Sequence, residues 1–351
     1  MELNIIIDYL IISIIASMAI NNVLRNIAQH NSVLIDLPDR SRKFHKRATP
    51  LTGGISILLA ILITGRIYID FNDLIGYVPL FTYHLVLSSI MLVFSFLLDD
   101  IYKLKPLIRI LIQCFLALYV IISTDVTIGT LGNLFGLGEI NLGILDIPFT
   151  IFCVVGLMNA FNMIDGLNGI CASLALLPLA FVAYFGNFSY GLLIPIGAII
   201  GFLAYNLGYL GKKRGVFLGD SGSNVLGFAV AFICIEYSQN INHNSYINPV
   251  TALWLVAIPL LDCITVFTSR LLKGIMPFRP GRDHLHHKLL DIGIKPKKIL
   301  YIFISISVFL SLIGLFLENN FPDKEYISFY AFVVLSVSYY LLSKVKLEQN
   351  V

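Results

Sequence analysis

Four short polar motifs interrupt an otherwise apolar chain. They are LLDD at 97–100, NAFNMIDGLNG at 159–169, FLGDSGS at 217–223 and RDHLHH at 282–287. Their carboxylates, amides, glycines and imidazoles are the groups that hold divalent cations and phosphates in proteins. If the apolar segments between them cross a membrane in alternation, all four motifs fall on the same face. This pattern indicates chemistry on an anionic, water-soluble compound at a lipid surface.

The first motif ends an apolar segment with two adjacent carboxylates, Asp99 and Asp100. Such a pair can hold a hard divalent cation through oxygen, or position a phosphate through that cation. Lys103, Lys105 and Arg109 follow at a spacing that lets their positive charges reach the same anion. A solvated helix end flanked by basic residues explains the motif equally well, so taken alone it leaves both interpretations open.

The second motif places Asn159, Asn162 and Asp165 three residues apart, on neighbouring positions of one helix face. Gly166 and Gly169 then allow the backbone to leave the helix and approach a ligand closely. Asn and Asp also cap helices. Capping does not require so many amides and carboxylates within ten residues, so we favour a functional role.

In the third motif, glycines flank Asp220, which we expect to bind a metal ion. We expect the backbone N–H groups of this turn to bind phosphate, and Ser221 or Ser223 to cap the following helix. Phe217 offers an aromatic face for a base. No GK[ST] follows, so this is not a Walker loop, and an ordinary glycine turn is the alternative.

The fourth motif brings His284, His286 and His287 together in the longest basic loop. No cysteine accompanies them, and Arg282 and Lys288 are close in sequence. Positive charges around imidazoles oppose a metal ion and favour an anion such as a diphosphate. We therefore expect anion binding rather than zinc binding.

Two further features stay open at this point. A basic cluster that includes Lys46 opens the first polar loop, and it could bind substrate or anionic lipid headgroups equally well. Asp262 lies about eight residues inside an apolar segment, where an ionisable group is a functional candidate. It could equally hold a neighbouring helix through a hydrogen bond, so we assign it no role.

The composition identifies the elements that position these motifs. Of 351 residues, 57% are hydrophobic and 13% charged, with a mean hydropathy of +0.85, whereas soluble domains have roughly 25% charged residues. The continuous apolar runs predict an all-α, polytopic membrane protein forming a single domain over residues 1–351. The eleven expected helices are 3–24, 53–70, 78–98, 106–124, 146–161, 170–186, 191–209, 223–238, 250–270, 299–317 and 326–343; the fifth is short and the least secure.

Basic residues predict the orientation. If the eleven helices alternate, 22 of the 24 Lys and Arg residues fall on one side, and such residues accumulate in cytoplasmic loops. We therefore expect the N-terminus outside, the C-terminus in the cytoplasm and the four motifs at the cytoplasmic face. A transporter would instead place polar groups near the bilayer midplane, which makes that function less suitable.

The order of DD, NAFNMIDGLNG, FLGDSGS and HLHH resembles the polyprenyl-phosphate N-acetylhexosamine-1-phosphate transferases, a glycosyltransferase 4 or MraY-like family, over nearly the whole chain. The stretch 269–287, SRLLKGIMPFRPGRDHLHH, looks most like the branch that acts on UDP-GlcNAc and undecaprenyl phosphate. The branch that uses UDP-MurNAc-pentapeptide usually has three consecutive histidines, which Leu285 interrupts here.

The resemblance implies transfer of GlcNAc 1-phosphate from UDP-GlcNAc to undecaprenyl phosphate with release of UMP. In a bacterial inner membrane this would be the first membrane step of an O-antigen or enterobacterial-common-antigen type of polysaccharide. Another UDP-N-acetylhexosamine, such as a GalNAc or dideoxy-sugar derivative, is the alternative donor. The implied cofactor is Mg²⁺, with Mn²⁺ as its substitute. Membrane lipids are expected partners, nucleic acid is not, and a homodimer is one option.

The resemblance also implies roles for individual residues. Asp99, Asp100 and Asp165 match the family's acidic positions, and Asp220 with Asn162 would hold the magnesium ion. The remaining residues would contact substrate: Phe217 and Asn168 the uracil, Arg109 the lipid phosphate or the donor diphosphate, and Arg282, His284 and His287 the diphosphate and sugar of the donor. His286 and Lys46 are further candidates for substrate binding.

One position departs from the family pattern, because Lys103 stands where a third Asp often follows the pair. Asp99 is the family's suggested base, but a phosphate monoester has a second pKa near 6 and is mostly dianionic at neutral pH. Proton removal then saves only about 1 kcal/mol or less. We therefore expect Asp99 and Asp100 to act chiefly by positioning and metal-assisted electrostatics.

Overall fold

The computed structural model describes residues 2–38, 47–71, 78–185, 190–239, 247–276 and 281–344. Over these residues the chain is helical, apart from one short antiparallel ladder and one isolated bridge. The helices form two compact units, which are considered one at a time. The first unit comprises Met1–Thr124 and Gly186–Ala229, and the second comprises Asp125–Phe185 and Val230–Val351.

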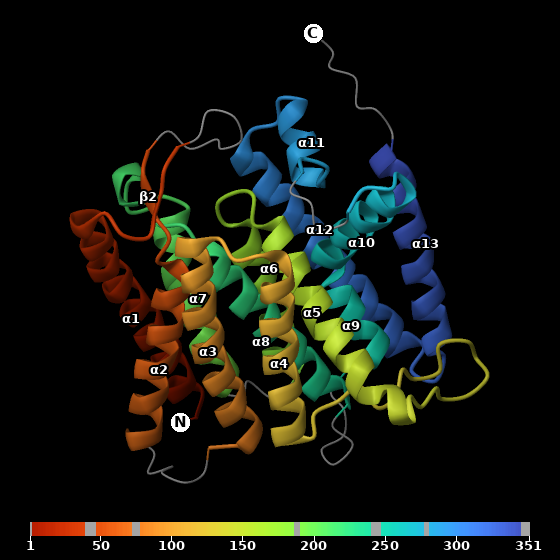
Figure 1. Cartoon of the computed structure of the whole chain (residues 1–351). Coiled ribbons are helices and arrows are strands. Elements are labelled where there is room, and N and C mark those ends of the chain that lie inside the picture. The colour runs from red at the N-terminus through yellow and green to blue at the C-terminus, as the bar shows by residue number, and fades with distance from the viewer. Residues whose placement is uncertain are drawn as a thin grey trace. The chain divides into compact units, whose positions relative to one another are not determined.

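The first unit contains the helices coloured red to orange in Figure 1, together with green helices from later in the chain. Its elements are α1 (Glu2–Asn31), β1 (Ile35–Asp36), β2 (Thr49–Pro50), α2 (Gly53–Phe71), α3 (Leu80–Tyr102), α4 (Pro106–Thr124), α7 (Tyr190–Asn206), η2 (Lys212–Arg214) and the first half of α8 (Gly219–Gln239).

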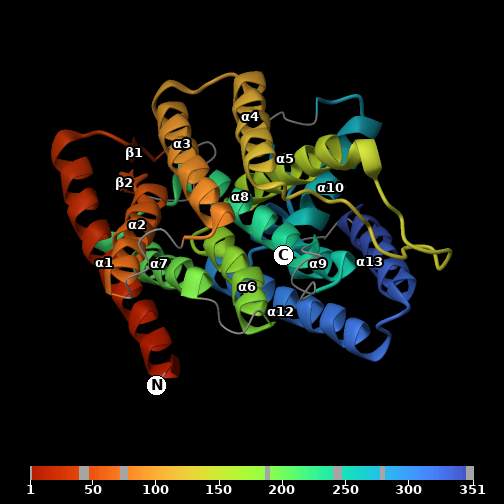
Figure 2. The same ribbon diagram turned by 90° about the horizontal axis from the view of Figure 1, so that it is seen from below.

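Small residues let α1 and α7 pack closely, and both views of the ribbon show the two helices side by side (Figures 1 and 2). A Cβ atom at Gly197 would lie 2.6 Å from the Leu10 carbonyl oxygen, so only glycine fits there. The hydroxyls of Ser13 and Ser17 donate to the carbonyl oxygens of Ile194 and Ala198 at 2.6 and 2.7 Å. Close backbone approach with such hydrogen bonds is typical of helix pairs in membranes.

The second unit contains η1 (Gly143–Leu145), α5 (Asp146–Ile164), α6 (Ile170–Phe185), the end of α8, α9 (Pro249–Leu255), α10 (Ala257–Leu272), α11 (Leu285–Asp291), α12 (Pro296–Asn320) and α13 (Glu325–Lys344). Trp254 on α9 anchors its core. The indole N–H donates to the Ser328 hydroxyl on α13 at 3.0 Å, and the ring makes an edge contact with Phe332. Gly314 on α12 leaves room for the same side chain, because a Cβ there would lie 2.5 Å from the Trp254 Cβ.

The helix expected at 250–270 is broken. It consists of α9 and α10, which meet at Val256 with a bend of 84°. Pro259 lies in the first turn of α10. Because proline has no N–H, it cannot donate to the Leu255 carbonyl four residues earlier, and a continuous helix through this point would lose that hydrogen bond. The sequence contained this signal, but our prediction of one straight helix was wrong.

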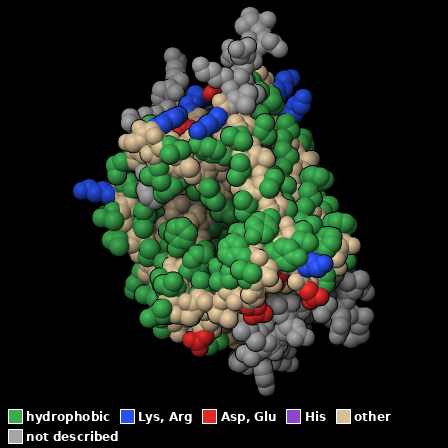
Figure 3. Space-filling view, turned by 90° about the vertical axis from the view of Figure 1, so that its right-hand side faces the viewer, with side chains coloured by type: hydrophobic (Ala, Val, Ile, Leu, Met, Phe, Trp, Pro, Cys, Tyr) green, Lys and Arg blue, Asp and Glu red, His purple; other side chains and the backbone are tan. Residues whose placement is uncertain are grey.

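Every one of the eleven expected helical segments is helical in the structure. Among the described residues, seven helices are long and apolar enough to cross a membrane, or eight if α9 and α10 form one broken span. The fifth expected helix is among the seven. Figure 3 shows a broad band of hydrophobic side chains, with most of the visible Lys and Arg side chains near one edge. The chain is a multi-pass membrane protein, and the count of eleven crossings stays a prediction.

Candidate active site

Asp99 closes the turn that follows its own helix. The backbone N–H of Lys103 donates to the Asp99 carbonyl oxygen at 2.8 Å, and that of Leu104 donates to its Oδ1 at 2.7 Å. Lys103 lies at φ 54°, the left-handed conformation that Asn and Asp adopt more readily than Lys. Pro106 then starts α4, where its missing N–H costs no hydrogen bond. The turn therefore brings α4 back beside Asp99.

Asp100 reaches the first turn of α8. Its Oδ1 accepts the backbone N–H of Asp220 at 3.2 Å, and its Oδ2 accepts that of Ser221 at 3.5 Å. Gly219 lies at φ 78°, and a Cβ atom there would lie 3.0 Å from Asp100 Oδ2. The first and third motifs, separated by more than one hundred residues, therefore meet in the first unit.

The structure corrects two sequence predictions about the third motif. The N–H groups of Asp220 and Ser221, which we expected to bind phosphate, are hydrogen-bonded to a carboxylate from another helix. We also expected a serine to cap α8. Instead the Ser223 hydroxyl donates to the carbonyl oxygens of Gly219 and Asp220, and the Ser221 hydroxyl is buried with no hydrogen-bond partner among the described residues.

A pair of glycines that sequence reasoning missed holds this turn in place. Gly53 and Gly54 begin α2, and their N–H groups donate to the carbonyl oxygens of Phe217 and Leu218 at 2.9 and 3.0 Å. A Cβ atom at Gly54 would lie 2.5 Å from the backbone nitrogen of Gly222. The signal was present as two glycines after a polar loop, but nothing local names the segment that such glycines contact.

Phe217, whose ring we expect to stack on a base, is held in place by hydrogen bonds at both its N–H and its carbonyl group. Its N–H donates to the Pro50 carbonyl at 2.8 Å, and its carbonyl accepts the Gly53 N–H. Its side chain is partly exposed, so part of the ring is accessible. Lys46, the expected donor contact in the same unit, lies outside the described residues.

Arg109 connects the carboxylates. Its Nε lies 3.0 Å from Asp99 Oδ1, and its Nη1 lies 3.7 Å from Asp220 Oδ2. Asp220 is close enough to repel Asp99 and Asp100 electrostatically. Asp99 is fully buried, and its Oδ2 has no hydrogen-bond partner among the described residues. Arg109 contacts two carboxylates and Asp100 lies next to Asp220, so acidic groups outnumber the one guanidinium beside a buried, unsatisfied oxygen.

A divalent cation fits this group. Mg²⁺ is usually held by one or two carboxylates together with phosphate oxygens and water, and its charge would offset the excess. The described residues contain no set of three acidic, histidine or cysteine side chains already arranged as a metal site. Asp220, with the free Oδ2 of Asp99, therefore supplies a partial ligand set that phosphate oxygens would complete. Asn162 belongs to the second unit, and its role as a ligand stays a prediction.

Two buried amide side chains connect α4 to α8 beside the carboxylate group. The Gln113 side chain on α4 donates to Asn224 Oδ1 on α8 at 2.7 Å, and the Asn224 amide donates to the Asp220 carbonyl oxygen at 2.8 Å. Both side chains are almost completely buried. Buried, satisfied polar pairs restrict geometry, so this pair fixes α4 against the turn that holds Asp220.

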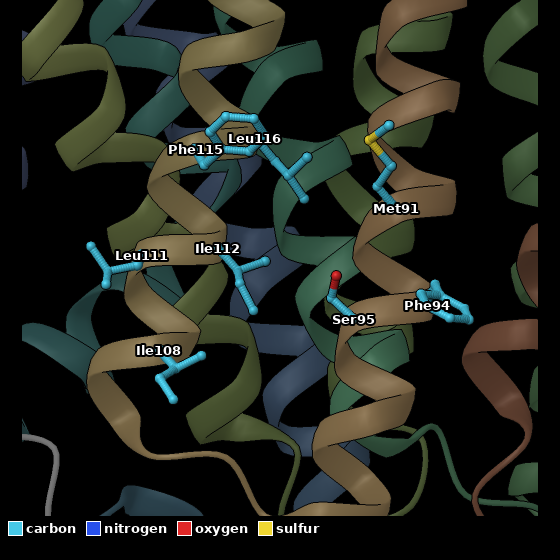
Figure 4. Close-up of a pocket in the computed structure, with 8 residues that line it drawn as sticks. All are labelled: Met91, Phe94, Ser95, Ile108, Leu111, Ile112, Phe115 and Leu116. Carbon is cyan, nitrogen blue, oxygen red and sulfur yellow. The ribbon is translucent and has the colours of Figure 1, made fainter.

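An apolar groove runs along the seam between α3 and α4 toward the same group. Its volume is about 450 Å³. Figure 4 shows Ile108, Ile112 and Leu116 on α4 facing the Met91 and Ser95 side of α3. The groove also includes Phe94, Leu111 and Phe115. Ile108 directly precedes Arg109, and Ser95 lies one helical turn before Asp99, so the groove extends to the helical turns next to the charged group.

The second and fourth motifs meet in the second unit. As the glycines predicted, α5 ends at Ile164 and the chain turns before α6, with Gly169 at φ 83°. His286 lies against Gly166 so closely that a Cβ atom there would collide with the imidazole Nε2. Asn162 and Asp165 are partly exposed at this turn and Asn168 is exposed, so all three are accessible to a ligand; their roles stay predictions.

His286 and His287 lie with their ring centroids 4.1 Å apart. Burial, together with the nearby His287, lowers the pKa of His286 to about 3. Burial, with the charges of His284 and Arg282, also lowers the pKa of His287. Both rings are therefore neutral at neutral pH, and the positive charge expected of this motif must come from other side chains.

Ion pairs hold the loop on either side of the histidines. Arg270 on α10 is buried, and its Nε lies 2.9 Å from Asp283 Oδ2. Desolvation raises the pKa of Asp283, but the hydrogen bond and charge of Arg270 outweigh it and lower the pKa. Arg282, expected to grip the donor, forms an exposed pair with Asp291 at 2.6 Å. Because this pair is exposed, it is weak enough to exchange for a phosphate.

His284, the remaining predicted ligand of this motif, is buried at the start of α11, against Asp262 of α10. Its Nδ1 lies 2.6 Å from Asp262 Oδ2. Asp262, which the sequence left unassigned, thus contacts a predicted site residue.

Comparisons with known proteins agree with the motif order. The family described as glycosyl transferase family 4 matches residues 82–238. Proteins named undecaprenyl-phosphate alpha-N-acetylglucosaminyl 1-phosphate transferase match over most of their length. The one from Escherichia coli O157:H7 is 33% identical over 312 residues, 87% of this chain and 82% of that protein. The one from Haemophilus influenzae is 32% identical over 317 residues, 87% and 85% of the two chains.

The family match includes the first three motifs, the relatives match over 87% of the chain, and the geometry joins the four motifs in pairs around acidic, basic and amide side chains. The chain therefore belongs to glycosyl transferase family 4 and is a membrane-embedded phosphotransferase.

Proposed function

We propose that the protein transfers GlcNAc 1-phosphate from UDP-GlcNAc to undecaprenyl phosphate, with the reaction at the cytoplasmic side of a bacterial inner membrane. The relatives' names support the two substrates. The distribution of Lys and Arg supports the orientation. The observation that carries the proposal is the group of Asp99, Asp100 and Asp220 around Arg109.

Both substrates are anions, so mutual repulsion is the first obstacle to transfer. An oxygen of the lipid phosphate attacks the sugar-bearing phosphorus, a new P–O bond forms, and the bond to UMP breaks. UMP leaves with the negative charge. Mg²⁺ held by Asp220 and Asp99 would screen that charge, and Arg109 supplies a positive charge at the same place.

Asp99 acts in positioning rather than as a base. Its Oδ1 is already bound by the Leu104 N–H and the Arg109 Nε, which hold the side chain in one orientation. The lipid phosphate is mostly dianionic at neutral pH, so little is gained by removing its proton. Oδ2 is the oxygen left for a cation.

We place the first isoprene units of the acceptor in the groove between α3 and α4. The groove is lined mostly by apolar side chains and ends beside Arg109 and Asp99. A phosphate at Arg109 with its chain in the groove satisfies both ends of an amphipathic molecule. A tryptophan at Ile112 would fill the groove, and we expect it to raise the KM for undecaprenyl phosphate while leaving that for UDP-GlcNAc unchanged.

The control for this variant is a tryptophan at Ile122, an exposed position on α4 outside the groove. If Ile112→Trp and Ile122→Trp give the same acceptor KM as the wild type, ordinary bilayer lipid occupies the groove and the placement is wrong.

The function is tested with purified protein, undecaprenyl phosphate, Mg²⁺ and a panel of UDP-sugars, following UMP release. We expect release with UDP-GlcNAc, none in EDTA, and a loss of about 10²–10³-fold in kcat/KM for Asp100→Asn. Asp70→Asn, at an exposed Arg66–Asp70 pair, is the matched control and should retain activity. Preference for UDP-GalNAc would correct the donor, and no release with any donor would refute the function.

A further inference from the structure

Asp262 is a buried carboxylate surrounded by donors from three separate segments. Its Oδ2 lies 2.6 Å from Nδ1 of His284, while its Oδ1 accepts the Leu285 N–H at 2.9 Å and the Tyr339 hydroxyl at 3.1 Å. The Asp262 and His284 side chains are 3% and 6% exposed. One carboxylate therefore joins α10, α13 and the start of α11.

The hydrogen-bond pattern determines the ionisation state of Asp262 and the position of the proton on His284. The Leu285 N–H can only donate, and the phenol of Tyr339 donates to the same oxygen, so Oδ1 is an acceptor. A carboxylate that accepts several hydrogen bonds is favoured in its ionised form. An ionised carboxylate can only accept, and His284 must then carry its proton on Nδ1. The other ring nitrogen, Nε2, is left to contact a ligand.

Helix packing alone does not require this arrangement. Burying a charge in a helix core is costly unless several donors compensate it, and an apolar residue would pack these helices without that cost. The carboxylate instead holds both the side chain of His284 and the backbone of the next residue. It fixes the ring and the loop that bears it together.

We propose that Asp262 and Tyr339 are positioning residues that hold His284 in one orientation and one tautomer, with Nε2 directed to the nucleotide-sugar donor. This inference rests on the proposed function for the identity of the donor. A carboxylate that orients a histidine in this way is a general means of preparing an imidazole for substrate contact.

The test is a double-mutant cycle on kcat/KM for UDP-GlcNAc. We expect Asp262→Asn to lower it about 10–100-fold and Tyr339→Phe, which removes one hydroxyl, to lower it about 2–10-fold. In a His284→Gln background, both changes should add less than twofold, because there is no longer an imidazole to orient. Full losses in that background would show that the residues act independently of His284 and would overturn the proposal.

A second measurement is independent of activity. In protein labelled with ¹⁵N-histidine, the signal that disappears in His284→Gln should show a proton on Nδ1, and this signal should change in Asp262→Asn and Tyr339→Phe. If the wild-type protein released no UMP but this signal behaved as expected, the proposed function would be wrong. The positioning of His284 by Asp262 and Tyr339 would still be supported. A His284 ring protonated only on Nε2, or a His284 signal unchanged in both variants, would overturn the proposed positioning role of Asp262 and Tyr339.

Discussion

The two polar groups of this molecule are built in opposite ways. In the first unit, Asp99 and Asp220 pair with one guanidinium while Asp100 accepts backbone N–H groups beside them, and a buried oxygen of Asp99 has no hydrogen-bond partner among the described residues. In the second unit, Arg270 pairs with Asp283, and His284 with Asp262. The first group has an excess of negative charge, which a bound cation would neutralise. In the second group the charged side chains are paired, although both ring nitrogens of His286 and Nδ1 of His287 are buried with no hydrogen-bond partner among the described residues.

The sharpest way to break this comparison is to remove one carboxylate from each group. Asp220→Asn should lower kcat/KM by about 10³-fold yet leave the metal-free protein as stable as the wild type or more so, because it relieves repulsion among like charges.

Asp283→Asn should do the reverse. It removes the charge that pairs with the buried Arg270, so the free energy of unfolding should fall by about 1–2 kcal/mol. Kinetics and chemical denaturation of both variants check the contrast, and an Asp220→Asn protein that is clearly destabilised without metal would contradict it.

Gly166→Ala tests the contact between the second and fourth motifs. The new methyl group would collide with the His286 ring, and we expect a loss of about 1–3 kcal/mol in stability from overpacking. Gly156→Ala, on α5 just before this turn, has open space around it and should be neutral or slightly stabilising. Equal stabilities for the two variants would mean that His286 does not lie against this turn.

His286 should make stability depend on pH. Its pKa is about 3 in the folded protein and near 6.5 when unfolded, so the unfolded chain takes up the proton first as the pH falls. The stabilisation is complete above about pH 6.5, is lost progressively toward pH 3, and costs about 1.4 kcal/mol by pH 5.5.

Thermal unfolding between pH 7.5 and 5 measures this loss. In His286→Leu the slope should be reduced, whereas His30→Gln, at an exposed position, should behave as the wild type. A slope unchanged in His286→Leu would show that the ring is not held neutral by burial.

Lys103→Gly is expected to have the smallest effect. Lys103 has a φ of 54°, which costs a side-chain-bearing residue about 1 kcal/mol, so glycine should stabilise the first unit by about 0.5–1 kcal/mol. Lys105 is outside the left-handed region, and Lys105→Gly should be destabilising by a similar amount. Denaturation midpoints of the two variants check the sign, and a loss of stability in Lys103→Gly would refute the strain.

The sequence was sufficient to place the helices, because hydropathy is a local property, and residue type alone made the acidic residues candidates for the site. It did not indicate that Asp100 binds the start of α8, that Gly54 contacts Gly222, or that Asp262 meets His284. Those contacts join segments 22 to 168 residues apart along the chain, and only the packing of helices decides them. The break at Val256 was readable from Pro259, but a continuous apolar run concealed it.

The central claim is that the carboxylates around Arg109 form a cation site. Mn²⁺ binding, measured by electron paramagnetic resonance on the purified protein with UDP present, tests it most directly. We expect about one tightly bound Mn²⁺ per chain, displaced by Mg²⁺, lost in Asp220→Asn and retained in Asp70→Asn. An Asp220→Asn protein that binds Mn²⁺ as tightly as the wild type would contradict the account.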